Sequence, residues 1–248
     1  MEIDGAPPVL LLPGGAESCA GFFPGLVEGL PGVRVIQYDR PGTGTSTEDG
    51  SLAGAAAHLG SFLERLDAGP VVVVGQSLGG AVGVLLARAH PELVAGLVLL
   101  DPTPVNDPRL CARIERMTRV LGRLSVVPGL GAVLGKGFRA AALRGARDLR
   151  PDCAAALRRT ANLDIPTLAR AVVGLTEVSR SLHESDLPRL PSVVVTADRK
   201  PGHAVRRAHE RLATALDARL VSWPGATHSV HLDHPDEVLD TVREVVAA

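Results

Sequence analysis

Short apolar runs alternate with longer amphipathic stretches along most of this 248-residue chain. The apolar runs are rich in Val and Leu, and each ends in a Gly, an Asp or a polar residue that can turn the chain. Six of them are predicted to be strands, at residues 9–12, 33–38, 71–74, 97–100, 192–196 and 218–222. Apolar strands separated by helices are typical of the α/β class, with a mostly parallel sheet and helices on both faces.

Helical stretches lie between several of these runs. They are predicted at residues 52–66, 79–89, 205–216 and 235–246. The last one begins with Pro235 followed by two acidic residues, a composition typical of a first helical turn.

The alternation breaks between Pro102 and Arg189, where no strand-like run occurs. Helical pieces are predicted there instead, separated by Pro128, Pro151 and Pro166, at residues 108–121, 137–149, 152–162 and 166–182. An insertion of this length between two strands is too long for a simple loop. We therefore expect two units, a core formed by residues 1–101 and 190–248 and a helical cap or lid at residues 102–189.

The segment Gly75-Gln76-Ser77-Leu78-Gly79 is a G-x-S-x-G motif between a predicted strand and a predicted helix. In that context a serine sits on a tight turn above the carboxyl ends of the strands, where it can act as a nucleophile. The Leu78 N–H, at the positive end of the helix, would stabilise an oxyanion at the same point. The motif also occurs by chance, and Ser77 would then only cap the helix.

With this motif in place, the sequence resembles the α/β-hydrolase superfamily, in its serine-nucleophile branch with a helical cap. Pro13-Gly14-Gly15 after the first strand resembles the loop that supplies the second oxyanion N–H, which the resemblance assigns to Gly15, with Ala16 as the alternative. The family usually has His at the position of Pro13, and this departure alters loop rigidity more than chemistry because the donor is backbone. Residues 38–46 resemble the family's D-x-x-G-x-G-x-S turn, which we interpret as structural.

A serine hydroxyl needs a neighbouring base, and histidine is suited to that task near neutral pH. His228 follows the last predicted strand and precedes the final helix, where the superfamily places its catalytic histidine. His231 and His234 follow at three-residue intervals, which also allows a metal interpretation. Pro235 breaks a helix there, and no Cys or acidic motif accompanies the histidines, so we expect neither a metal nor another cofactor.

The other histidines have no motif around them. We expect His231 to pack beside the site and His234 to precede the last helix. The remaining five are expected to be solvated on helices or loops: His58, His90, His183, His203 and His209.

The triad acid departs from the family pattern. Its usual position, after the penultimate strand, is Lys200, which cannot accept a hydrogen bond from histidine. Asp198 lies two residues earlier on the same loop, whereas Asp101 follows the strand after the nucleophile strand, where some branches of the superfamily place the acid. We prefer Asp101 and keep Asp198 as the alternative; Asp101 before Pro102 could also be a turn-initiating residue.

Charge and composition limit the classes of binding partner that we expect. The 26 basic and 27 acidic residues nearly balance, and no basic stripe interleaved with aromatics suggests a nucleic acid partner. Three cysteines are too few for a disulfide framework or a zinc site. The first eight residues do not resemble a signal peptide, and no apolar stretch reaches the ~20 residues that span a bilayer, so we expect a cytoplasmic protein without a membrane partner.

These features predict acyl transfer to water on an ester, thioester, lactone or amide of a small, mostly apolar molecule. Phe22, Phe23 and the cap would shape the pocket. The spacing of five arginines between residues 108 and 123 places several of them on one helical face: Arg109, Arg113, Arg116, Arg119 and Arg123. We interpret this face as solvated, with recognition of an anionic substrate group as the alternative. A lyase or transacylase on the same fold, or a silent ligand-binding protein, remain alternative functions, and the sequence does not define the oligomeric state.

Overall fold

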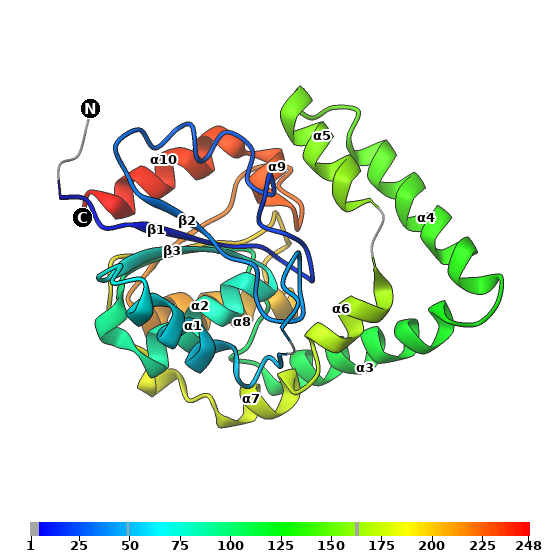
Figure 1. Cartoon of the computed structure of the whole chain (residues 1–248), viewed down its shortest axis with the longest axis horizontal. Coiled ribbons are helices and arrows are strands. Elements are labelled where there is room, and N and C mark those ends of the chain that lie inside the picture. Colours follow the sequence, from blue (N-terminus) through cyan, green and yellow to red (C-terminus); the bar gives the residue numbers. More distant parts are fainter. Residues whose placement is uncertain (1–4, 49, 162–163) are drawn as a thin grey trace.

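A parallel sheet carries the core of the computed structural model, which describes residues 5–48, 50–161 and 164–248 (Figure 1). Its strands are β1 (Val9–Leu12), β2 (Val35–Gln37), β3 (Val71–Gln76), β4 (Val94–Leu100), β5 (Ser192–Val195) and β6 (Arg219–Val221). They lie in the order β2-β1-β3-β4-β5-β6, and every neighbouring pair is parallel. The predicted mostly parallel sheet is confirmed.

Two apolar layers cover the sheet because side chains of a strand alternate between its faces. On β3, Val71 and Val73 pack in one buried cluster, whereas Val72 and Val74 pack in the other. The first layer is formed with helices α1 (Ala55–Arg65), α2 (Leu78–Ala89) and α8 (Ala204–Leu216), and the second with α10 (Pro235–Val246). Figure 1 shows these helices on opposite sides of the sheet, as predicted.

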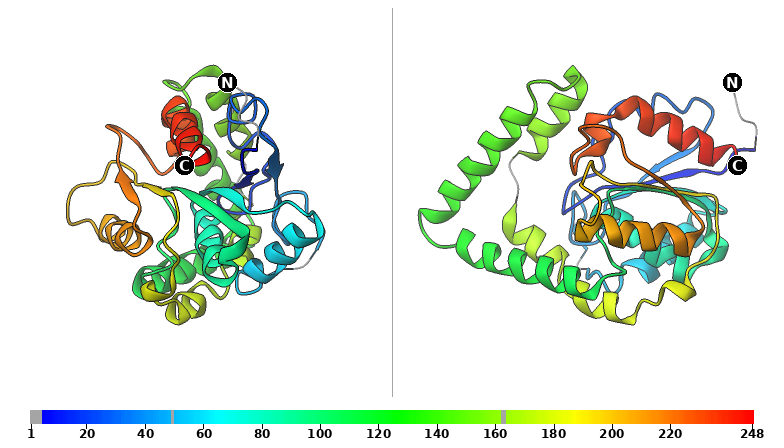
Figure 2. Two further views of the ribbon diagram at one scale, coloured as in Figure 1. Left: turned by 90° about the vertical axis from the view of Figure 1, so that its left-hand side faces the viewer. Right: turned by 180° about the vertical axis from the view of Figure 1, so that it is seen from behind.

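The segment between β4 and β5 is helical, as expected. It contains α3 (Pro108–Ser125), α4 (Leu130–Gly145), α5 (Pro151–Thr160), α6 (Ile165–Ala171) and α7 (Leu175–Ser181). Helices α3 and α4 extend away from the sheet, and α5 returns toward the short helix α9 (Val230–Asp233) (Figures 1 and 2). The division into a core and a cap at residues 102 and 189 stays a prediction.

Several boundaries differ from the predictions. The helix predicted at 166–182 is two helices: α6 ends at Ala171, and Gly174 adopts a left-handed conformation (φ 85°) directly before α7. Helix α4 begins at Leu130, seven residues earlier than predicted. The piece predicted at 152–162 is observed as α5, and its last residue, Asn162, lies outside the described residues. Two short 3-10 helices, Pro91–Leu93 and Glu184–Asp186, were not predicted.

Strand β4 begins three residues earlier than its apolar run suggested. Ala95 and Gly96 have low β-propensity, which hid this part of the strand. A Cβ on Gly96 would lie 2.6 Å from Val245 Cγ1, so the small residue allows α10 to approach the sheet closely.

Among the described residues, no single helix is long and apolar enough to cross a membrane. Helices α3 and α4 meet that length and composition only when taken together, and they are bent by 118° relative to each other.

Candidate active site

Ser77 lies at the turn between β3 and α2, at the carboxyl end of the sheet. Its backbone has φ 50° and ψ −115°, a combination that L-residues rarely adopt, and it is the residue before the first turn of α2. Its N–H donates to the Leu100 carbonyl at 3.0 Å, which ties the turn to β4. The G-x-S-x-G motif therefore forms the strand–turn–helix arrangement that the sequence predicted.

The two glycines of the motif allow this turn. A Cβ on Gly75 would lie 2.7 Å from the Gly79 carbonyl oxygen, and a Cβ on Gly79 would overlap the Leu12 carbonyl oxygen. Both contacts involve backbone, which cannot move aside as a flexible side chain does. Side chains at these positions would force β3, α2 and the end of β1 apart.

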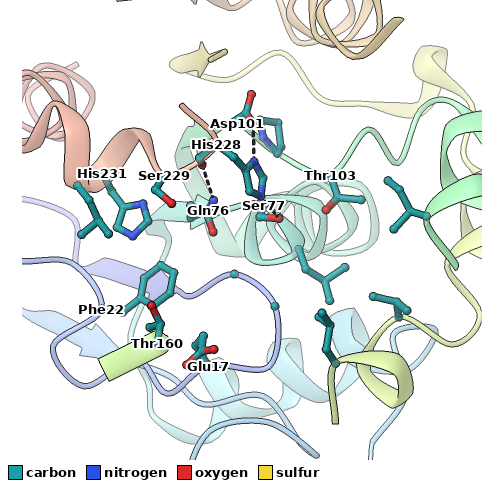
Figure 3. Close-up of a pocket in the computed structure, with 18 of the residues that line it drawn as sticks. Glu17, Phe22, Gln76, Ser77, Asp101, Thr103, Thr160, His228, Ser229 and His231 are labelled. Atoms are coloured by element: carbon teal, nitrogen blue, oxygen red, sulfur yellow. Dashed lines mark hydrogen bonds and ion pairs between the residues drawn. The ribbon is translucent and has the colours of Figure 1, made fainter. Parts of the chain in front are cut away.

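Ser77, His228 and Asp101 form one hydrogen-bonded chain (Figure 3). Ser77 Oγ lies 2.9 Å from His228 Nε2, and His228 Nδ1 lies 2.6 Å from Asp101 Oδ2. A carboxylate accepts from an imidazole N–H, which fixes the tautomer with its free nitrogen toward the serine. The sequence predicted all three residues, which approach from three distant parts of the chain.

Arg199 also binds Asp101, and sequence reasoning missed it. Its Nη2 donates to Asp101 Oδ2 at 2.6 Å, and its Nη1 donates to Oδ1, which also accepts from the Ala197 N–H at 2.9 Å. The Asp101 side chain is 1% exposed and that of Arg199 is 20% exposed. Burial favours a higher pKa for Asp101, but the hydrogen bonds from Arg199, His228 and Ala197 outweigh it and hold the pKa well below its ordinary value.

Arg199 could have been expected from the topology. It stands four residues beyond the end of β5, and Asp101 follows the end of β4, which is the neighbouring parallel strand. The carboxyl ends of parallel strands meet at one edge of a sheet, so residues just beyond them lie close together.

The alternative acid, Asp198, has another role in the described structure. It is exposed, and its Oδ2 accepts from the Gly225 N–H at 2.9 Å, which holds the turn before the His228 loop. Lys200, at the usual acid position, is exposed too. Of the two predicted carboxylates, Asp101 is the one that contacts His228.

Gln76 supports the His228 loop from the end of β3. Its Nε2 donates to the His228 carbonyl at 2.8 Å, and its Oε1 occupies the space beside Gly14 that a Cβ would need. Gln76, the second residue of the G-x-S-x-G motif, therefore connects three parts of the site: the turn at Ser77, the loop that carries His228 and the loop after β1.

His209 corrects a prediction. We expected a solvated residue, but the side chain is 0% exposed, with Nδ1 2.9 Å from Thr196 Oγ1 and Nε2 2.7 Å from the Pro102 carbonyl. Burial lowers the pKa of His209, which favours the neutral imidazole in this position. It packs directly behind Asp101, with Nδ1 3.8 Å from Asp101 Oδ1.

The three histidines of the H-x-x-H-x-x-H run have different partners. His231 is buried and stacked on Phe22, with 4.6 Å between ring centroids, and burial lowers its pKa to about 3. His234 lies against Trp223 and has Nδ1 3.2 Å from Glu237 Oε1. Their surroundings agree with the expected positions beside the site and before the last helix.

The predicted oxyanion donors lie beside Ser77. Leu78 is the first residue of α2, so its N–H has no acceptor within the helix. Gly15 and Leu78 both line the cavity that contains Ser77. The buried Arg40 donates through Nη2 to the Gly15 carbonyl and thereby holds the loop after β1 in place.

A cavity of about 440 Å³ opens above Ser77. Phe22 contributes to its wall, whereas Phe23 packs behind Phe22, with the ring centroids 4.9 Å apart. The inserted helices add apolar side chains that include Ile114, Leu168 and Val172. The five arginines on and near α3 are all exposed, in agreement with a solvated face.

Comparisons with known proteins agree with this architecture. The model of the alpha/beta hydrolase family matches residues 9–241. Lipase LipV of Mycobacterium tuberculosis is 42% identical over 88 residues, which cover 33% of this chain and 32% of LipV. Esterase Rv0045c of the same organism is 28% identical over 97% of this chain and 83% of its own length. A thermophilic esterase from Thermogutta terrifontis superposes with a TM-score of 0.73 at 23% identity, over 96% of this chain and 88% of that one.

The chain therefore belongs to the α/β hydrolase family. The matched stretch spans about a third of LipV, so the similarity to that protein concerns only part of it.

Proposed function

We propose that the protein hydrolyses esters of small, mostly apolar molecules through an acyl-enzyme on Ser77. The observation that carries the proposal is the continuous hydrogen-bonded chain from Ser77 Oγ through His228 to Asp101. Similarity to a lipase and to two esterases supports an ester as the substrate, within a broader class that includes thioesters, lactones and amides.

In the proposed reaction, Ser77 Oγ attacks the carbonyl carbon while His228 Nε2 accepts the hydroxyl proton. The carbonyl oxygen becomes an oxyanion that accepts hydrogen bonds from the Leu78 and Gly15 N–H groups. His228 then donates its proton to the leaving oxygen, and the alcohol departs. Water enters, gives a proton to His228 and attacks the acyl-enzyme, and collapse of the second oxyanion releases the acid and returns the proton to Ser77.

Asp101 stabilises the imidazolium that forms twice in this cycle. Its low pKa keeps it ionised across the neutral and mildly acidic range, so it can fulfil this role. No step of this scheme requires a metal or a cofactor.

A fluorophosphonate probe tests the proposal directly, because it reacts with an activated serine and forms a stable adduct. Wild type is expected to be labelled, and Ser77→Ala is not. Ser18→Ala provides a matched serine control outside the triad; Ser18 donates to Asp39 Oδ2 at 3.0 Å. Absence of labelling in folded wild type would refute the proposal and favour a silent ligand-binding protein.

A screen with p-nitrophenyl esters and acyl thioesters of graded chain length then measures hydrolysis itself. We expect kcat/KM to be highest for short or medium chains, because the cavity is limited to about 440 Å³. Labelling of Ser77 without hydrolysis of any of these compounds would favour a lyase or transacylase.

A further inference from the structure

Glu17 places a carboxyl group in the wall of the Ser77 cavity. It stands on the loop after β1, two residues beyond Gly15, and its N–H donates to the Gly14 carbonyl at 3.3 Å. This turn fixes the direction of the residue on the same loop that carries a proposed oxyanion donor. Glu17 is half-buried and lies below Ser77 in Figure 3.

Nothing in the described part of the chain pairs with this carboxyl group. No Lys, Arg or His nitrogen in residues 5–48, 50–161 and 164–248 lies within 4.0 Å of it, and no N–H or O–H there donates to it. Burial raises the pKa of Glu17, without an opposing donor or cation. By contrast, Glu115 accepts from Thr176 and Arg119, and Asp101 accepts from Arg199. A partly desolvated carboxylate without donors costs free energy unless a ligand supplies them.

Several polar side chains of the cavity wall lie on the side of Ser77 that holds Glu17. Thr160, Phe22, Ser229 and His231 lie on the same side of Ser77 as Glu17, whereas Thr103 lies on the opposite side (Figure 3). The Thr160 hydroxyl donates to the Leu157 carbonyl at 3.2 Å, so its oxygen is left as an acceptor. This side therefore presents the Glu17 carboxylate and the Thr160 oxygen as acceptors to a bound molecule, beside the Ser229 hydroxyl.

Much of the remaining wall is aliphatic, although the side chains of Thr103 and Thr118 also line it. Ile114 of α3, Leu168 of α6 and Val172 at the end of α6 contribute aliphatic side chains. A substrate with one apolar part and one part that donates hydrogen bonds matches both sides.

We propose that Glu17 binds a hydrogen-bond-donating group, a hydroxyl or a protonated amine, on the alcohol part of the ester. This inference rests on the proposed function and specifies its substrate class. His228 protonates the leaving oxygen, and the residues that follow it in the chain, Ser229 and His231, line the side that holds Glu17. The alcohol part lies on that side, and the acyl part lies against the aliphatic wall. Glu17 acts as a specificity residue and takes no proton in the reaction.

The test uses two pairs of butyrate esters that differ only in polarity. 2-Methylbutyl butyrate is compared with 2,3-dihydroxypropyl butyrate, and 3-methylbutyl butyrate with 2-(dimethylamino)ethyl butyrate, which is cationic at pH 7. The measured quantity is the ratio of kcat/KM within each pair. The ratio is independent of the fraction of active enzyme, so partial misfolding of a variant does not affect it.

Glu17→Leu is expected to lower the polar-to-apolar ratio by at least about tenfold for one pair, the usual effect of losing a hydrogen bond to a charged group. Glu17→Gln keeps a hydrogen-bond acceptor but removes the negative charge, so it distinguishes a hydroxyl from an ammonium group on the substrate. A loss in both variants for the amine pair identifies an ammonium, whereas a loss in Glu17→Leu alone for the diol pair identifies a hydroxyl. Glu64→Leu, on the exposed face of α1, is the control and leaves both ratios unchanged.

Unchanged or higher ratios in Glu17→Leu, with hydrolysis that still depends on Ser77, would overturn the inference and leave the proposed function intact. If none of the four esters shows hydrolysis that is lost in Ser77→Ala, the proposed function itself is refuted, and the inference falls with it.

Discussion

Arg199 clasps Asp101 through both carboxylate oxygens while His228 binds one of them. The carboxylate therefore has a permanent cation on one side and the imidazole on the other. A two-point contact fixes the plane of the carboxylate as well as its charge, so it determines the direction from which Oδ2 faces His228.

Breaking this ion pair is expected to destabilise the fold. Arg199→Met leaves the buried Asp101 without its cation, which we expect to lower the free energy of unfolding by about 2–3 kcal/mol; a fully buried pair would cost more. Urea unfolding of wild type and variant near neutral pH measures this difference in the free energy of unfolding. Arg219→Met is the matched control, because Arg219 and its partner Glu244 are both exposed, and the change should stay within about 0.5 kcal/mol. Equal effects of the two substitutions would contradict the prediction.

The identity of the triad acid is tested by two conservative substitutions. Asp101→Asn is expected to lower kcat by about 10³–10⁴-fold, because an amide does not stabilise the imidazolium and favours the wrong tautomer. Asp198→Asn should stay within about an order of magnitude of wild type, since its carboxylate holds the Gly225 N–H and does not contact His228. Equal and mild losses in both variants would exclude the triad described here.

Much of this arrangement could be predicted from the sequence. The central strands are uninterrupted apolar runs, because both of their faces are covered, and such runs are readily recognised. Ser77 is marked by its glycines, whose small size the turn requires. The contact between Asp101 and His228 depends on sheet order, and only the family resemblance supplied that order.

The burial of His209 is indicated by the spacing of apolar residues along its helix. It shares one face of α8 with Leu212, Ala213 and Leu216, at the spacing of three, four and seven residues that defines a buried helical stripe. An imidazole on such a stripe is buried when polar partners exist for both nitrogens. Those partners, Thr196 and Pro102, follow other strands and become visible only in the folded chain.

Backbone strain at Ser77 can be measured with two substitutions that remove its hydroxyl group. Ser77 has φ 50° and ψ −115°, and Ala at this position keeps the strain, whereas Gly relieves it. We expect Ser77→Gly to exceed Ser77→Ala in unfolding free energy by about 1 kcal/mol, because relief of strain outweighs the greater flexibility of the unfolded glycine chain. Chemical denaturation of both variants checks this. A more stable Ala variant would indicate that the turn is unstrained.

His231 is expected to make stability depend on pH. Burial lowers its pKa from the ordinary 6.5 to about 3, so between these values the unfolded chain binds a proton that the folded chain does not. Stability is therefore lost as pH falls from 6.5 toward 3, by up to about 1.4 kcal/mol per pH unit for this residue. His231→Phe keeps the ring stacked on Phe22 and removes the proton site.

The checking measurement is the free energy of unfolding of wild type and His231→Phe at pH 7, 6 and 5. The difference between the two proteins should grow in favour of the variant as pH falls, since the contributions of all other groups cancel. Parallel curves would show that His231 does not titrate differently in the two states.

The helices between β4 and β5 leave the sheet after Asp101 and return to the strand that precedes Arg199. The ion pair between Asp101 and Arg199 thus connects the two ends of the inserted segment at the edge of the sheet. If the helices between these ends lengthened, shortened or were replaced, the ion pair would still hold Asp101 at its distance from His228. Sequence changes in α3 to α7 during evolution would then alter which molecules the cavity binds, while Ser77, His228 and Asp101 kept their arrangement.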